Sequence, residues 1–221
     1  PEVPGVMWQF VEAVEGMAWA CEQLDVPVVG GNVSFYNQTD GVDIYPAPVV
    51  GMLGFCDPMP ETPPRLDRAE EGMAIWVVGQ DPQGDFAASA IDRIVNGNLG
   101  GRPADVDGDR ARHAVSAAAT LAYSTPVLHD ISTGGLAVAL AEIAIASGVG
   151  FTVDAGSIAD LFDETPLRFV AIGHGDDLDT MESYRRIGTM GGSTLDFGDA
   201  GTLALDEATS IWRDALPRRM R

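Results

Sequence analysis

The chain has 221 residues and a formal net charge of -20 at pH 7, from 33 acidic and 13 basic residues. This excess of carboxylates excludes sequence-independent binding to nucleic acids or to anionic membranes, because both require clustered cations. Every basic residue is an arginine. The absence of lysine excludes a lysine-containing phosphate-binding loop and a Schiff-base mechanism.

Hydrophobic residues make up 46% of the chain and aromatic residues 7%. This content supports one large or two small domains with an aliphatic core, and it favours an enzyme of the α/β to α+β class over a disordered chain. Cys21 and Cys56 lie far apart and lack metal-ligand spacing, so we expect reduced thiols and a cytoplasmic location. We find no signal peptide and no apolar run near the roughly 20 residues of a membrane helix. The first residue is not Met, which suggests a piece of a longer protein.

The first 56 residues predict one helix and two strands. Apolar residues recur at three- and four-residue spacing over residues 7–24, as in an amphipathic helix that ends near Asp25. Residues 28–29 and 46–55 are apolar runs next to Gly or Pro, and we expect them to be strands. These are too few strands to close a sheet. We therefore expect exposed edges that pair with further chain or with another copy, which would give a homodimer.

A Gly-rich string lies between the two predicted strands and reads Gly30-Gly31-Asn32-Val33-Ser34-Phe35-Tyr36-Asn37. Consecutive glycines let a backbone bring its N–H groups against an anion, and the oxygens of Asn32 and Ser34 are hard donors of the kind that Mg²⁺ prefers. On an extended segment Asn32, Ser34 and Tyr36 share one face. The pattern also fits a Gly-Gly hairpin or bulge with a polar outer face.

Residues 57–68 contain four prolines among charged residues and can neither continue a helix nor support a sheet ladder. We predict a linker at residues 57–70, between a first domain of residues 1–56 and a second of residues 71–221. The second domain is predicted to be α+β, with a mixed sheet flanked by helices. Its strands are expected at residues 73–79, 127–130, 151–153, 169–172 and 194–197. Its helices are expected at residues 85–95, 110–123, 136–147 and 178–187 and around Ile211, with a glycine-rich loop at residues 96–103.

A second constellation follows the predicted strand at residues 127–130 and reads His129-Asp130-Ile131-Ser132-Thr133-Gly134-Gly135. The free N–H groups and the positive dipole of the next helix point at this turn. A metal-bound phosphate would fit there, with Asp130 on Mg²⁺ and Ser132 donating to a phosphate oxygen. Alternatively, Asp130 or Ser132 is the helix cap. For His129 we favour a satisfied core histidine, and for Glu142 a pairing or capping role, over catalysis.

Other polar residues carry weaker signals. His113 and His174 have no metal-ligand partner at useful spacing. The loop at residues 96–103 could pin an anion with its amides and Arg102, but a solvent-exposed loop is the simpler interpretation.

Together and in this order, the two constellations resemble the synthetase subunits of the phosphoribosylformylglycinamidine synthases of purine biosynthesis, within the aminoimidazole ribonucleotide synthetase-like superfamily. The Gly-Asn-Val-Ser-Phe-Tyr-Asn string is the specific part of the resemblance. The resemblance covers nearly the whole chain, at residues 1–10, Gly16, 30–37, 46–54, 100–103 and 129–150. Chains of that family are longer, with four domains in two pseudo-equivalent halves, and this sequence is similar to the final portion. The implied fold is the end of a synthetase-type N-terminal domain followed by a complete C-terminal α+β domain.

The resemblance implies an ATP-dependent carbon–nitrogen ligase that phosphorylates the amide oxygen of formylglycinamide ribonucleotide before ammonia attacks. It places Gly31 at ATP, Asn32 at Mg²⁺ and Ser34 at the ribonucleotide substrate, with the catalytic histidines upstream. Asp130 and Ser132 match the metal and ATP positions of the second half, which in some members is an auxiliary, noncatalytic site. The implied partners are the missing N-terminal half, a glutaminase subunit and a small accessory subunit, so this chain alone is expected to be inactive.

One departure from the family is clear. The family usually reads Gly-Gly-Ser-Glu-Tyr where this chain has Ala87-Ala88-Ser89-Ala90-Ile91. Losing the carboxylate and both glycines weakens the case for a nucleotide at the auxiliary site and leaves Asn32 and Ser34 untouched. Two alternatives stay open. One is a nucleotide-binding or structural module without turnover, and the other is a kinase-like relative acting on another small molecule.

Overall fold

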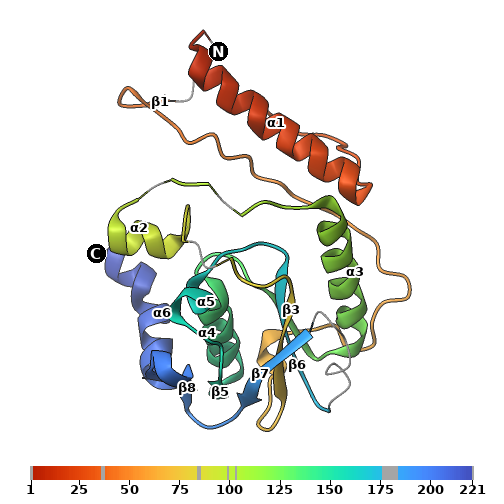
Figure 1. The fold of residues 1–221 in the computed structure, drawn as a ribbon, viewed down its shortest axis with the longest axis vertical. Coiled ribbons are helices and arrows are strands. Elements are labelled where there is room, and N and C mark those ends of the chain that lie inside the picture. Colours follow the sequence, from red (N-terminus) through yellow and green to blue (C-terminus); the bar gives the residue numbers. More distant parts are fainter. Residues whose placement is uncertain are drawn as a thin grey trace. The chain divides into compact units, whose positions relative to one another are not determined.

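The computed structural model describes residues 2–35, 38–83, 86–98, 100–102, 104–175 and 184–220. The chain divides into two compact units, Pro1–Asp57 and Pro58–Arg221 (Figure 1). Among the residues described, no helix combines the length and the apolar character that crossing a membrane would take. Cys21 and Cys56 are both free thiols, as predicted.

The first unit contains one long helix and one short hairpin. Helix α1 spans Pro4–Leu24, which confirms the predicted helix, and it ends at Asp25 in the left-handed conformation. Proline fits its first turn because the N–H that proline lacks has no partner there. Strands β1 (Gln38–Thr39) and β2 (Val42–Asp43) form the hairpin, with Asp40 and Gly41 at positive φ in the turn. A turn with two residues at positive φ matches the twist of the strands it joins.

The strands predicted at residues 28–29 and 46–55 are wrong, because neither segment forms a strand. Val29 is 96% exposed and Phe55 is fully exposed. An apolar run becomes a strand when a neighbouring strand accepts and donates its backbone hydrogen bonds. In the described residues of this unit, the paired strands are the two-residue β1 and β2, and these pair with each other.

The second unit is built on a seven-stranded sheet in the order β4-β6-β3-β7-β5-β8-β9. All neighbouring pairs are antiparallel except β5 with β8, so the predicted mixed sheet is confirmed. The strands are β3 (Ala74–Gly79), β4 (Val127–Asp130), β5 (Phe151–Val153), β6 (Arg168–Gly173), β7 (Tyr184–Met190), β8 (Thr194–Asp196) and β9 (Thr202–Ala204).

Helices cover both faces of this sheet (Figure 1). The described helices of this unit are α2 (Ala90–Asn96), α3 (Gly108–Ser124), α4 (Gly135–Ser147), α5 (Ile158–Phe162) and α6 (Leu205–Arg219), with short 3-10 turns at Leu66–Arg68 and Gly198–Ala200. Alternate residues of a strand point to opposite faces. Ile75 and Val77 accordingly lie in the large core with α4, whereas Val78 packs with Leu121 of α3.

One predicted helix of the second unit is a strand. Residues 184–187, placed in a helix at 178–187, belong to β7, and residues 178–183 lie outside the described part of the chain. Strand β7 lies between β3 and β5 and pairs with both, and this pairing overrides local helix propensity. Helix α5 and strand β9 were not predicted, although Ser157 and Asp160 form a capping box at the start of α5.

The helix predicted at residues 85–95 starts later, at Ala90. The Ser89 hydroxyl caps it by accepting the N–H of Asp92 at 3.2 Å, whereas Asp85 lies outside the described residues. In the proline-rich stretch, Arg65 donates its N–H to the Pro126 carbonyl at 2.9 Å, and Ala69 is buried. Its later residues are therefore held to the second unit.

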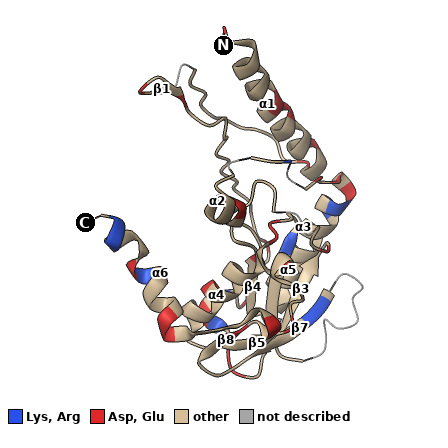
Figure 2. Cartoon of the chain, turned by 60° about the vertical axis from the view of Figure 1, so that its left-hand side comes forward, with Lys and Arg blue, Asp and Glu red and all other residues tan. Residues whose placement is uncertain are grey.

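Charge is unevenly shared between the two units. The first arginine is Arg65, so the first unit carries carboxylates and no basic side chain. Figure 2 shows arginines in the second unit, for example on β7 and at the end of α6. Any anion bound by the first unit would have to be held by backbone N–H groups or by a cation from elsewhere.

The second unit buries an ion pair between Arg168 and Asp163. Arg168 and Asp163 have fully buried side chains, and Arg168 Nη1 lies 3.2 Å from the Asp163 carbonyl and 3.5 Å from its Oδ1. Burial lowers the pKa of Arg168, and the Asp163 carboxylate opposes that shift. Asp163 also accepts the N–H of Thr165 at 2.7 Å. The pair thereby fixes the chain between α5 and β6.

We predict that Arg168→Ala lowers the free energy of unfolding by about 3 kcal/mol, because it leaves the Asp163 carboxylate buried without its cation. Urea unfolding followed by circular dichroism measures the change. Arg102→Ala, which removes an exposed partner of Asp105, is the matched control and should cost less than about 1 kcal/mol. Equal losses in the two variants would contradict this account.

Candidate functional site

The first candidate segment, residues 30–35, lies in the open on the first unit. Gly30 and Gly31 have ordinary negative φ, and among the described residues no atom lies within 4 Å of a Cβ built at either position. Neither the backbone nor the packing of this chain therefore requires glycine there. No turn forms at this point either; the hairpin lies later, at Gln38–Asp43, so the Gly-Gly hairpin alternative is wrong.

The side chains of this segment divide between two roles. Asn32 and Ser34 lie together, with Asn32 Nδ2 3.5 Å from Ser34 Oγ, while the Phe35 ring packs on Phe10 of α1 with 5.1 Å between centroids. Asn32 and Ser34 share a face, as predicted; Tyr36 and Asn37 lie outside the described residues. The segment thus offers an amide oxygen, a hydroxyl and open backbone.

The oxygens of Asn32 and Ser34 suit a hard cation such as Mg²⁺, which phosphate groups also bind. Within the described ranges, no group of three or more His, Cys, Asp or Glu side chains is arranged to hold a metal. Mg²⁺ commonly takes one or two protein oxygens and fills its other positions with water and substrate phosphate oxygens. Asn32 fits such a role as one ligand, and it could not hold the ion alone.

The second candidate segment joins β4 to α4 in the second unit. Strand β4 ends at Asp130, and the N-cap of α4 is Gly134 at φ 87°, a residue without a side chain that could cap the helix. The alternative in which Asp130 or Ser132 caps the helix is therefore wrong. The Ser132 carbonyl accepts the N–H of Gly135 at 2.9 Å, which closes the turn.

His129 lies between two carboxylates. Its Nδ1 is 3.0 Å from Asp130 Oδ1 and its Nε2 is 3.1 Å from Glu142 Oε2 on α4. Its side chain is 18% exposed, which confirms the predicted satisfied histidine, and Glu142 has the predicted pairing role. Burial raises the pKa of Asp130, but hydrogen bonds from Ser132 and His129 outweigh that effect and hold the pKa below its ordinary value.

The anion at the start of α4 is a side chain of the protein itself. Glu164 Oε1 accepts the N–H of Gly134 at 2.8 Å and the N–H of Ala90, the first residue of α2, also at 2.8 Å. Both helix N-termini present partial positive charge to this carboxylate. Glu164 was missed in the sequence, because it lies 30 residues from Gly134 and 74 from Ala90 and belongs to no motif.

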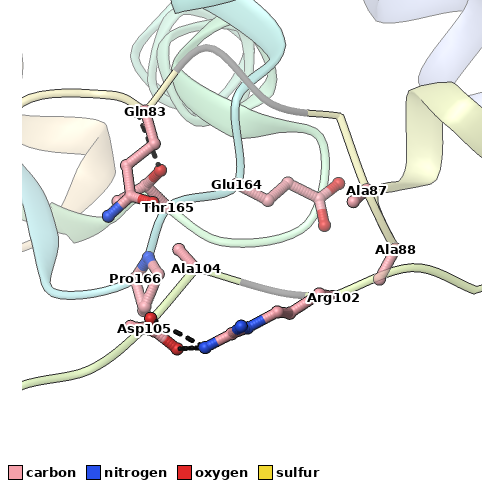
Figure 3. A pocket seen from close by; sticks show the side chains of 9 residues that line it. All are labelled: Gln83, Ala87, Ala88, Arg102, Ala104, Asp105, Glu164, Thr165 and Pro166. Carbon is pink, nitrogen blue, oxygen red and sulfur yellow. Dashed lines mark hydrogen bonds and ion pairs between the residues drawn. The ribbon is translucent and has the colours of Figure 1, made fainter.

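Glu164 also borders a cavity of about 240 Å³ in the second unit (Figure 3). Arg102 lies on one side of it and pairs with Asp105 at 2.9 and 3.0 Å. Both side chains are more than 80% exposed, which favours the solvent-loop interpretation of residues 96–103 over a built anion site. Leu99 and Pro103 of that loop lie outside the described residues. The cavity is lined by Gln83, Ala87, Ala88, Arg102, Ala104, Asp105, Glu164, Thr165 and Pro166.

One of the alanines that line the cavity, Ala88, has a backbone conformation typical of glycine. Ala88 has φ 63°, in the left-handed region that side chains disfavour. Its N–H donates to the Gly100 carbonyl at 3.3 Å, and a Cβ at Gly101 would stand 2.7 Å from the Cβ of Ala87. The backbone therefore adopts at position 88 a conformation that suits the glycine usual in the resembled family.

The mixed sheet covered by helices, with a glycine-led turn between strand and helix, defines an α+β domain. The C-terminal domain of the AIR synthase related proteins matches residues 70–191, and their N-terminal domain matches residues 1–56. The chain belongs to this family of AIR synthase related proteins, and the predicted family resemblance and fold class are confirmed.

Relatives within the family share one name. The phosphoribosylformylglycinamidine synthase subunit PurL of Thermobifida fusca is 43% identical over 210 residues, which cover 88% of this chain and 27% of that protein. The PurL of Frankia casuarinae is 38% identical, over 98% of this chain and 30% of its own. The structure of Thermotoga maritima PurL complexed with FGAR matches with a TM-score of 0.53 at 10% identity, over 68% of this chain and 29% of that one. The chain thus spans less than a third of the length of these relatives.

We predict that Ala88→Gly raises the free energy of unfolding by about 1 kcal/mol, because it removes the strain of a side chain at positive φ. Ala87→Gly is the matched control: its φ is not positive, so the added freedom of the unfolded chain should lower stability by about 0.5 kcal/mol. Urea midpoints of the two variants decide the matter. A loss of stability in Ala88→Gly would show that the strain is absent.

We also predict that Glu164→Ala lowers the free energy of unfolding by about 2 kcal/mol, because two backbone N–H groups lose a charged acceptor. Hydrogen exchange at Gly134 and Ala90 should speed up in the same variant. Asp105→Ala removes a nearby but exposed carboxylate and serves as the control. Unchanged exchange at both amides would contradict the role assigned to Glu164.

Proposed function

We propose that this chain is the C-terminal part of an ATP-dependent carbon–nitrogen ligase that converts formylglycinamide ribonucleotide to formylglycinamidine ribonucleotide. The observation that carries the proposal is the Gly30-Gly31-Asn32-Val33-Ser34 segment, whose glycines serve neither turn nor packing in this chain. Its donors suit phosphate and Mg²⁺. The names of the relatives support the same assignment.

Each residue of the first segment takes one role in this proposal. Gly31 lets the backbone approach the ATP phosphates, and Asn32 supplies an oxygen to Mg²⁺. Ser34, beside Asn32, hydrogen-bonds the ribonucleotide substrate. Bound Mg²⁺ would neutralise phosphate charge, which this unit cannot do because it has no basic residue.

The second segment is proposed to serve an auxiliary nucleotide position, with Asp130 as a metal ligand and Ser132 as a donor to ATP. The ionised Asp130 carboxylate, 60% exposed, supports the metal role. Because Glu164 already binds the N–H of Gly134, a phosphate here would rely on the side chain of Ser132 and not on that amide.

The reaction divides between this chain and others. The terminal phosphoryl group of ATP passes to the amide oxygen of the substrate, and ADP leaves. Ammonia then adds to the activated carbon, and phosphate departs with that oxygen to leave the amidine. We propose that the catalytic histidines and the missing half of the synthetase come from outside this chain, and that a glutaminase subunit supplies ammonia with a small accessory subunit. The fragment alone would be inactive, and we place the assembly in the cytoplasm.

Exposed backbone in the first unit supports a need for partners. Residues 28–29 and 46–55 form no strand and are largely exposed, so they could pair with the missing half or with a second copy in a homodimer. The second candidate function is a module that binds nucleotide, or only supports the fold, without turnover. The alanines at positions 87, 88 and 90 and the internal Glu164 carboxylate favour it for the second unit. A kinase-like relative that acts on another small molecule is the remaining alternative.

We predict that Asn32→Ala reduces substrate-dependent phosphate release at least tenfold and raises the Mg²⁺ concentration needed for half-maximal rate. The assay supplies the chain with the upstream half of the synthetase, ATP, ammonia and formylglycinamide ribonucleotide. Gln38→Ala, which removes a neighbouring amide outside the string, is the matched control and should leave the rate unchanged.

Calorimetry of Mg-ATP on the same assembly separates the candidate functions. If Mg-ATP binds without phosphate release, the nucleotide-binding module is favoured. If Mg-ATP binds neither to wild type nor to Asn32→Ala, a structural role is favoured. A folded assembly that phosphorylates a different small molecule would favour the kinase-like relative.

A further inference from the structure

Both ring nitrogens of His129 contact a carboxylate. A buried ring needs a partner at each nitrogen, and here both partners are carboxylate oxygens, with Asp130 at 3.0 Å and Glu142 at 3.1 Å. The two carboxylates differ in exposure, since Asp130 is 60% exposed and Glu142 is 37% exposed. The His129 ring therefore connects the exposed Asp130 carboxylate to Glu142 on helix α4.

The two contacts lie at the two ends of the ring. His129 stands on the same face of β4 as Val127, two residues earlier, which is buried in the core with α4. Its Nε2 reaches Glu142 on α4, so its Nδ1 is turned toward the neighbouring Asp130 at the end of the strand. Glu142 thus fixes the plane of the ring, and the ring fixes Asp130.

Asp130 is held from a second side as well. Ser132 also hydrogen-bonds its carboxylate. A carboxylate has room for about four hydrogen-bond or metal contacts, so two donors orient it without filling it. Groups that hold a metal-binding carboxylate from behind commonly change metal affinity 10- to 100-fold when removed.

We propose that His129 is a positioning residue which, anchored on Glu142, holds the Asp130 carboxylate in the orientation that binds the divalent cation of a metal–nucleotide complex. This inference rests on the metal role proposed above for Asp130. The Asp130, His129 and Glu142 side chains form a chain of contacts that ends on α4, so loss of His129 or Glu142 leaves Asp130 less firmly held.

The test measures Mn²⁺ binding in the presence of ADP, from the free-ion signal in electron paramagnetic resonance. It uses the 221-residue chain with Asn32→Ala as background, so that the first unit does not contribute. His129→Leu should weaken Mn²⁺ binding about tenfold. Glu142→Leu should weaken it less, about threefold, because the ring keeps one contact, and His129→Gln should restore part of the loss.

The control is His113→Leu, an exposed histidine on α3 whose Nδ1 contacts the Asp109 carbonyl at 3.0 Å, and it should leave binding within twofold. Asp130→Asn tests the metal role itself. If Asp130→Asn weakens Mn²⁺ binding and His129→Leu does not, the inference falls and the metal role stands. If Asp130→Asn does not change Mn²⁺ binding, both the metal role of Asp130 and the inference about His129 are wrong. Should His129→Leu be unfolded at the assay temperature by thermal melting, Glu142→Leu decides alone.

Discussion

The second unit depends on the pairing of β3 with strands on both sides. Strand β3 bonds β6 on one edge and β7 on the other, and its side chains are buried on both faces, with Ile75 and Trp76 almost fully covered. Both cores therefore share this strand. The position of β6 then sets that of β4, whose end carries Asp130, and the large core on the same face sets the axis of α4. The geometry of the second candidate segment is thus a consequence of sheet order.

The same constraint explains the contrast with the first unit. Backbone N–H and C=O groups of an apolar segment need partners before the segment becomes a strand. In the second unit, short runs such as residues 127–130 and 151–153 find partners far along the chain, and they are strands. In the described part of the first unit, the longer run at residues 46–55 finds none and stays exposed. Residues 46–55 also contain two prolines and two glycines, so both strand-breaking residues and the lack of a partner keep this segment out of a sheet.

This contrast also marks what the sequence could predict. Helix α1, with apolar residues at three- and four-residue spacing, and helix α4, an apolar run that ends at Gly148, follow from local pattern and were predicted within a few residues. The same holds for buried strands bounded by Gly or Pro, such as β4 and β5. Strand β7 was mistaken for a helix, because its strand conformation depends on its pairing with β3 and β5, which lie far away in the sequence. The segment at Gly31 and Asn32 was visible as a motif. Glu164 was not, because its partners become neighbours only when α2 and α4 meet.

The distribution of carboxylates sharpens the assignment of the site. In so acidic a chain, the position of a carboxylate says little by itself. What matters is which carboxylates already have hydrogen-bond or ion-pair partners within the fold. Glu164 is committed to two backbone N–H groups, Asp163 to Arg168, and Glu142 to His129. Asp130 differs from these three, because its hydrogen bonds come from neighbours within two residues and most of its surface stays exposed. A carboxylate that is oriented, ionised and still open to solvent has the properties of a ligand, whereas one consumed by the fold does not. The use of carboxylates by the fold, more than their number, therefore supports the proposal of Asp130 as a metal ligand.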